Sequence, residues 1–141
     1  MVDKAVLASK IAAVRDATAR IRSVLPPSAD AFRADRTARE VVVFNLLVAI
    51  QTCLDLAAHW LADEGWDVPP TYGDMFVGLA SHGVIDCALA RQLAAAAGLR
   101  NLVAHQYGVV DWQRVHAIAA TDLGDLDAFC AALAARAQLV E

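Results

Sequence analysis

The sequence predicts an all-α protein, an up-and-down bundle of four to five helices. Of its 141 residues, 31 are alanine, the residue with the highest helix propensity. No segment alternates between apolar and polar residues for long enough to predict a β-strand. Seven glycines and four prolines are too few for a collagen-like or low-complexity chain. This length suits one domain, so we expect residues 1–141 to form a single helical domain.

The first predicted helix covers residues 3–25. Apolar residues recur along it with helical spacing. They are Val6, Leu7, Ile11, Val14, Ile21 and Val24. Pro26 and Pro27 end this helix, because proline lacks an amide hydrogen and disfavours helical backbone in the residue before it. We expect residues 28–35 to form a short polar connection, followed by a long second helix over residues 36–64.

Glycines separate the remaining predicted helices. A short third helix is expected over residues 71–81. The fourth covers residues 86–107, with Asp86 as its N-cap, and Gly108 is well placed to end it. The last predicted helix covers residues 111–139. Two interruptions are open at this point, one near Gly98 in the fourth helix and one near Gly124 in the last.

Residues 41–62 are apolar and long enough to cross a bilayer core of roughly 30 Å. Five polar residues interrupt them, namely Asn45, Gln51, Thr52, Asp55 and His59. Because ionisable side chains are costly in lipid, we interpret the segment as a buried helix of a soluble bundle. The N-terminus also lacks the basic start and apolar run of a secretion signal. We therefore expect a cytoplasmic protein with no membrane contact.

The five polar residues of the second helix share one side of it. At 100° per residue, their side chains fall within an arc of about 120°. Such a stripe is typical of the solvent face of an amphipathic helix. It also fits the wall of a groove or a subunit interface, and in that case Asp55 and His59 are possible cleft-lining residues.

The cysteines and the other histidines show no metal-binding spacing. Cys53, Cys87 and Cys130 are odd in number and far apart, which predicts buried free thiols. His82 and His116 are expected at the surface, near helix ends. No C-x-x-C or H-E-x-x-H pattern occurs. We therefore expect neither a metal nor another cofactor.

The segment between Gly98 and Gly108 contains the clearest chemistry. Arg100 supplies a permanent planar cation that can hold a phosphate through paired hydrogen bonds. His105 titrates near neutral pH and can take or give a proton. Such a pair can cleave an RNA phosphodiester without a metal. In an ideal helix His105 lies about 140° from Arg100, so either the helix deforms or two chains combine their residues.

The run Arg100-Asn-Leu-Val-Ala-His105-Gln-Tyr107 resembles the R-x4-H-x-Y signature of the HepT-like branch of HEPN-domain proteins. The order of the predicted helices is similar too. The resemblance implies a HEPN-like bundle and a metal-independent endoribonuclease, the toxin of a HepT/MntA-type toxin–antitoxin system. It further implies a homodimer whose two motifs meet in a cleft. Its partner would be a minimal nucleotidyltransferase (MntA-like) antitoxin.

The same resemblance assigns roles to four residues. Arg100 and His105 would be catalytic, and Asn101 would support them. Tyr107 would be the hydroxyl that the antitoxin modifies with AMP, and the added negative charge would block a phosphate-binding site. In a dimer, two copies of His105 would supply both the base and the acid of the reaction. A non-catalytic helical module that binds a nucleotidyltransferase is the alternative interpretation.

The net charge of −4 argues against a protein held on nucleic acid by bulk charge. The charge is uneven, because residues 1–40 hold 8 Lys+Arg and 5 Asp+Glu, whereas residues 41–141 hold 4 and 11. The basic excess includes Arg33, Arg36 and Arg39. These arginines either flank a cleft lined by the second helix or form a solvated helix start. The acidity thus excludes only an extended, charge-driven grip on RNA.

Overall fold

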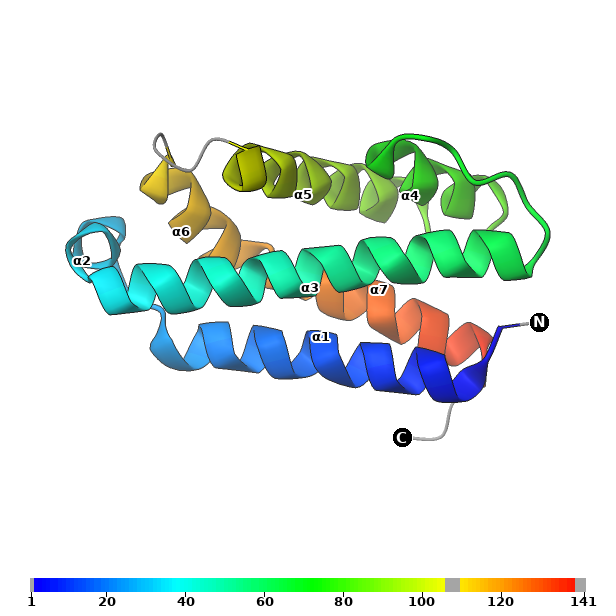
Figure 1. The fold of residues 1–141 in the computed structure, drawn as a ribbon, viewed down its shortest axis with the longest axis horizontal. Coiled ribbons are helices and arrows are strands. Elements are labelled where there is room, and N and C mark those ends of the chain that lie inside the picture. The colour runs from blue at the N-terminus through cyan, green and yellow to red at the C-terminus, as the bar shows by residue number, and fades with distance from the viewer. Residues whose placement is uncertain (1, 106–109, 139–141) are drawn as a thin grey trace.

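The described part of the chain is helical, which confirms the predicted all-α class. The computed structural model describes residues 2–105 and 110–138, and for residues 101–105 it describes the backbone alone. Seven helices and no strand occur in these residues (Figure 1). They are α1 (Lys4–Val24), α2 (Ala29–Ala34), α3 (Arg36–Asp63), α4 (Tyr72–Ser81), α5 (Cys87–His105), α6 (Trp112–Thr121) and α7 (Leu123–Arg136).

Side-chain caps fix several of these helix starts. The Asp3 carboxylate accepts hydrogen bonds from the backbone N–H groups of Ala5 and Val6. Asp86 is confirmed as the N-cap of α5, because its Oδ1 accepts from the N–H of Leu89 at 2.7 Å. Such caps satisfy amide donors that have no partner within the helix. The helix α5 passes through Gly98 without a break, and Gly108 lies outside the described residues.

One segment differs from the prediction, and one interruption that the sequence left open is present. Residues 28–35, expected as a connection, contain α2, because Ser28 caps it and Phe32 is fully buried. The last predicted helix is split into α6 and α7 at Asp122, two residues before Gly124. At the split, the Thr121 hydroxyl donates to the Ala117 carbonyl at 2.6 Å and lies 3.1 Å from a carboxylate oxygen of Asp122. Polar side chains that bond to the backbone in this way compete with helix continuation.

The long helix α3 is the centre of the bundle. It contacts each of the other six helices, with α1 along one side and α4 and α5 along another (Figure 1). The helices α3 and α5 run in opposite directions, so the end of α5 lies over the first half of α3 (Figure 1). One face of α3 stays open, and Phe44 on this face is 66% exposed.

Within the described residues, α3 is the one helix long and apolar enough to cross a membrane. Half of its most apolar stretch is buried inside the bundle. A core helix of a soluble protein passes the same test of length and composition. The rest of α3 includes the exposed Phe44, and large exposed apolar patches commonly mark interaction sites.

Candidate functional site

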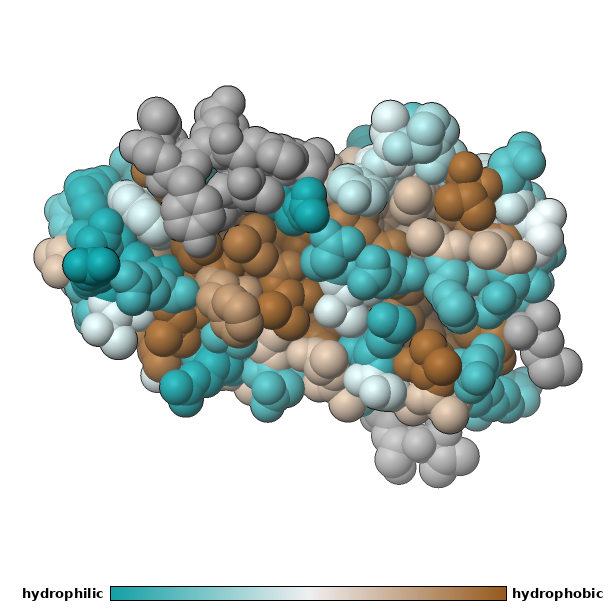
Figure 2. Space-filling model, in the orientation of Figure 1, coloured by the Kyte–Doolittle hydropathy of each residue, from teal (hydrophilic) through white to brown (hydrophobic). Residues whose placement is uncertain are grey.

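Arg100 lies in a groove between α5 and the open face of α3. Its side chain is half-buried, and the groove has a volume of about 410 Å³. The groove is lined by Phe44, Leu47, Val48, Gln51, Thr52 and Arg100. Figure 2 shows hydrophobic side chains gathered over this part of α3. An arginine beside apolar walls is a strong anion site, because the walls reduce screening of its charge by water.

The ring of Tyr72 supports this arginine from the side of α4. The guanidinium carbon of Arg100 lies 5.6 Å from the centroid of the Tyr72 ring, which is a cation–π contact. The contact limits the orientations open to the arginine, so less conformational entropy is lost when it binds an anion. Sequence reasoning missed Tyr72, since nothing in its local pattern connects the start of α4 with the end of α5.

The polar stripe of α3 contributes two residues to the groove, Gln51 and Thr52. The Gln51 amide donates to Asp55 at 3.0 Å, and its own oxygen is buried with no hydrogen-bond partner. The Thr52 hydroxyl donates to the Val48 carbonyl at 2.7 Å. Asp55 is exposed and does not line the groove, but Gln51 holds it at the groove's edge.

The two ends of the stripe lie apart from Arg100. His59 is one turn beyond Asp55 and pairs with Asp63, with 3.4 Å between His59 Nε2 and the carboxylate. Asn45 donates its amide hydrogen to the Val41 carbonyl at 2.8 Å. Neither residue lines the groove. The stripe is therefore divided between the groove and ordinary helix-surface contacts.

The rest of the sequence motif is described only in part. Asn101 and His105 belong to α5, and His105 is its last residue, but their side chains are outside the described atoms. Tyr107 lies outside the described residues. Along a helix, His105 is about 7.5 Å further than Arg100 toward the C-terminal end. That end points to the start of α6 (Figure 1).

Two sequence expectations about histidine and cysteine are wrong. His116 is buried rather than superficial, because its Nε2 lies 2.8 Å from the Pro26 carbonyl and its ring packs on Phe32. Cys87 is exposed, because it is the first residue of α5. His82 is exposed as expected and stacks on Trp66 with ring centroids 3.8 Å apart.

The two remaining cysteines are buried in the core, as predicted. A hydrogen bond to Cys130, together with burial, raises the pKa of the Cys53 thiol well above its usual range. A thiol that stays protonated is a poor nucleophile and a poor metal ligand. Among the described residues, no group of three or more His, Cys, Asp or Glu side chains is placed to hold a metal ion.

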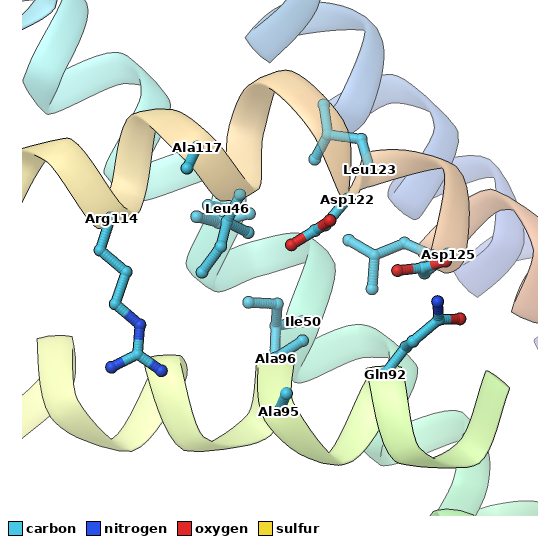
Figure 3. A pocket seen from close by; sticks show the side chains of 12 residues that line it. Leu46, Ile50, Gln92, Ala95, Ala96, Arg114, Ala117, Asp122, Leu123 and Asp125 are labelled. Atoms are coloured by element: carbon cyan, nitrogen blue, oxygen red, sulfur yellow. The ribbon is translucent and has the colours of Figure 1, made fainter. Parts of the chain in front are cut away.

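A second pocket lies between α5 and the junction of α6 and α7 (Figure 3). Its volume is about 220 Å³, and aliphatic side chains such as Leu46 and Ile50 line it. Arg114 stands on one side and Asp122 and Asp125 on the other (Figure 3). Burial and the nearby Asp122 raise the pKa of Asp125. Two carboxylates at one opening repel a polyanion, so Arg100 has the better environment for a phosphate.

Comparison with known proteins gives consistent matches. A family model described as ribonuclease HepT-like matches residues 14–133. The mRNA nuclease HepT of Shewanella oneidensis is 27% identical over 124 residues, which cover 88% of this chain and 92% of that protein. A solved structure of the tri-AMPylated Shewanella oneidensis HEPN toxin in complex with MNT antitoxin has a TM-score of 0.85 at 27% identity, over 92% of this chain and 97% of that one.

A further solved structure, of a toxin–antitoxin with AMP-PNP, has a TM-score of 0.87 at 26% identity. The match covers 94% of this chain and 99% of that chain. The relatives and the family model thus span most of the bundle, including the α3–α5 groove.

Proposed function

Because the chain belongs to the ribonuclease HepT-like family, we propose that it is an endoribonuclease toxin whose partner is a nucleotidyltransferase antitoxin. The observation that carries the proposal is the position of Arg100. Its guanidinium lies against Tyr72 and lines the groove on the open face of α3. A phosphodiester that enters this groove meets a fixed cation on the helix that also bears His105. The proposed site of action is the cytoplasm, where RNA is available.

The proposed reaction needs no metal. Arg100 binds the scissile phosphate and stabilises the extra negative charge of the phosphorane. His105 removes the proton of the neighbouring 2′-hydroxyl, whose oxygen then attacks phosphorus. The bond from phosphorus to the 5′-oxygen breaks, and this oxygen takes a proton from an acid. The products are a 2′,3′-cyclic phosphate and a 5′-hydroxyl.

A homodimer supplies the acid that one chain lacks. The exposed Phe44 and the neighbouring Leu47 and Val48 form an apolar surface along the groove that contains Arg100. When two copies join through this face of α3, their Arg100 residues approach each other across one cleft. The second copy of His105 is then the acid, and Asn101 supports the pair from the same helix turn.

The activity itself is tested with the purified chain and a labelled RNA in excess EDTA. We expect cleavage of the RNA and none of a DNA strand of the same sequence, because DNA lacks the attacking 2′-hydroxyl. Loss of cleavage in EDTA would contradict the metal-free mechanism. A chain that binds the antitoxin but neither cuts RNA nor slows growth would be the non-catalytic module instead.

Neutralisation is proposed to proceed by transfer of AMP to Tyr107. The tri-AMPylated state of the Shewanella oneidensis toxin supports this proposal. Each added phosphate brings negative charge next to the cation that binds RNA. After co-expression with the nucleotidyltransferase, we expect mass spectrometry to find AMP additions on the wild-type chain. Additions that persist in Tyr107→Phe would place the modification on another residue.

The Tyr72 contact predicts a measurable loss of activity. A cation–π contact contributes about 0.5–2 kcal/mol, which corresponds to roughly 2- to 30-fold in rate or affinity. We therefore expect Tyr72→Ala to lower kcat/KM for RNA cleavage by about that factor. Tyr72→Phe retains the ring and should stay within about twofold of wild type. Equal losses in both variants would show that the hydroxyl, rather than the ring, is what matters.

A further inference from the structure

Three arginines lie between the last turn of α2 and the first turn of α3, and the structure distinguishes them. Arg33 pairs with Asp30 at 3.1 Å, and Arg36 pairs with Glu40 at 2.9 Å. Arg39 makes no ion pair with any carboxylate among the described residues. Two of these charges are thus balanced within their own helices, whereas the charge of Arg39 is not.

Arg39 is instead held against an aromatic ring. Its guanidinium carbon lies 5.1 Å from the centroid of the Trp112 ring, at the first residue of α6. The Nε of Arg39 is buried and has no hydrogen-bond partner in the described structure. Trp112 is held in turn by Phe32, edge to face at 5.9 Å, and Phe32 is fully buried. The ring therefore fixes a guanidinium whose charge remains available.

Arg39 lies close along α3 to the residues that surround Arg100. Val43, Arg100 and Val115 surround one small cavity, so α3, α5 and α6 meet at this level. Arg39 is one helical turn before Val43 on α3, about 6 Å along the axis. The helices α3 and α5 run in opposite directions (Figure 1). The step along α3 from Val43 back to Arg39 therefore runs the same way as α5 does from Arg100 to its C-terminal end. Arg39 thus lies beyond the groove, on the side toward which α5 ends and α6 begins.

We propose that Arg39 binds a second phosphate of the RNA strand, on the α6 side of the one held by Arg100. The inference rests on the proposed ribonuclease function and adds to it a second anchoring point. A guanidinium held over a tryptophan ring can still offer the N–H groups of its two terminal nitrogens for paired hydrogen bonds to phosphate oxygens. Two fixed cations along the strand hold it at two points, so Arg39 contributes to RNA binding rather than to the chemical step.

The test compares Arg39→Gln with two matched controls, Arg33→Gln and Arg36→Gln. Each variant loses one positive charge from the same short segment, but the controls lose a charge already paired with a carboxylate. Binding is measured by fluorescence anisotropy of a labelled single-stranded RNA on the His105→Ala background, so that cleavage does not interfere. Steady-state cleavage is measured on the wild-type background.

For Arg39→Gln we expect the Kd and KM for RNA to rise about tenfold, with kcat within about threefold of wild type. The slope of log K against log salt should fall by about 0.7, the value for one phosphate contact on a single strand. The two controls should change Kd by less than about twofold. Arg39→Lys retains charge without the planar fork, so it should keep the salt slope and lose part of the affinity.

Each outcome bears on the inference. Equal effects of all three glutamine variants would show a general charge effect and overturn the assignment to Arg39. An unchanged salt slope in Arg39→Gln, with a lowered melting temperature, would show that Arg39 only packs α3 against α6. If the wild type cleaves RNA normally and Arg39→Gln binds it as tightly, the second anchor is wrong and the ribonuclease function stands. If no variant binds RNA, both are wrong.

Discussion

Replacing His105 by alanine is expected to lower kcat for RNA cleavage by about 10²- to 10⁴-fold, the usual contribution of a positioned general acid or base. RNA affinity should stay within a few fold, because the imidazole acts on protons rather than on phosphate charge. The measurement is single-turnover cleavage with the enzyme in excess, combined with a binding assay on the same RNA. Unchanged cleavage by His105→Ala would contradict the proposed mechanism.

The matched substitution at Arg100 should have a different kinetic signature. In the proposed mechanism Arg100 contacts the phosphate in both the bound state and the transition state, so Arg100→Ala should both raise KM and lower kcat. Arg100→Lys keeps a point charge but loses the planar fork and its stacking on Tyr72, and should recover only part of the activity. Both variants should also relieve growth arrest on expression, with helical content and melting temperature close to those of wild type.

Mixed dimers test whether the proposed reaction needs one copy of His105 or two. A dimer with one wild-type chain and one His105→Ala chain keeps a base or an acid, but not both. If the two copies act as proposed, the cleavage rate of this mixed dimer should fall nearly as far as that of a dimer with His105→Ala in both chains. The reason is that the rate losses from groups that act as a unit are not additive. Full activity per mixed dimer would contradict the two-histidine hypothesis. Half activity would indicate two independent sites.

The helices were predictable from the sequence because their signals are local. Pro26 and Pro27 after α1 and the Asp86 cap of α5 act within a few residues, and both predicted ends are confirmed. The short helix α2 was not predictable in the same way. Its stability depends on Phe32 packing against Trp112 and His116, which lie far away in the sequence. Tertiary contacts of this kind override a weak local preference for turn or coil.

In the candidate site, too, local patterns were predictable from the sequence and tertiary contacts were not. Arg100 is a candidate site residue from the motif alone, and its place in a groove depends on how α5 packs on α3. The partners of Arg100 and Arg39 were not identifiable, since Tyr72 and Trp112 lie on other helices. Helical periodicity placed the α3 stripe on one side of the helix. Only the packing shows that Gln51 reaches the groove whereas His59 pairs with Asp63.

On the open face of α3, Phe44→Asp is expected to disrupt the proposed dimer. Phe44 is 66% exposed in the single chain and borders the groove that contains Arg100. A buried aromatic residue at an interface commonly contributes about 2 kcal/mol or more. Burying an unpaired carboxylate in its place costs several kcal/mol in addition. Because each 1.4 kcal/mol changes a dissociation constant about tenfold, the variant should be monomeric at micromolar concentration.

Cleavage activity should depend on dimer formation, because the proposed reaction uses two copies of His105 and each chain supplies one. For Phe44→Asp we expect the cleavage rate per chain to fall at least about 100-fold and to rise with protein concentration. Sedimentation velocity measures the dimer over the same range. Val77→Asp is the matched control, since Val77 is a 51% exposed apolar residue on α4 that does not line the groove. It should leave both dimer and activity intact, and a fully active monomeric Phe44→Asp would show that one chain suffices for cleavage.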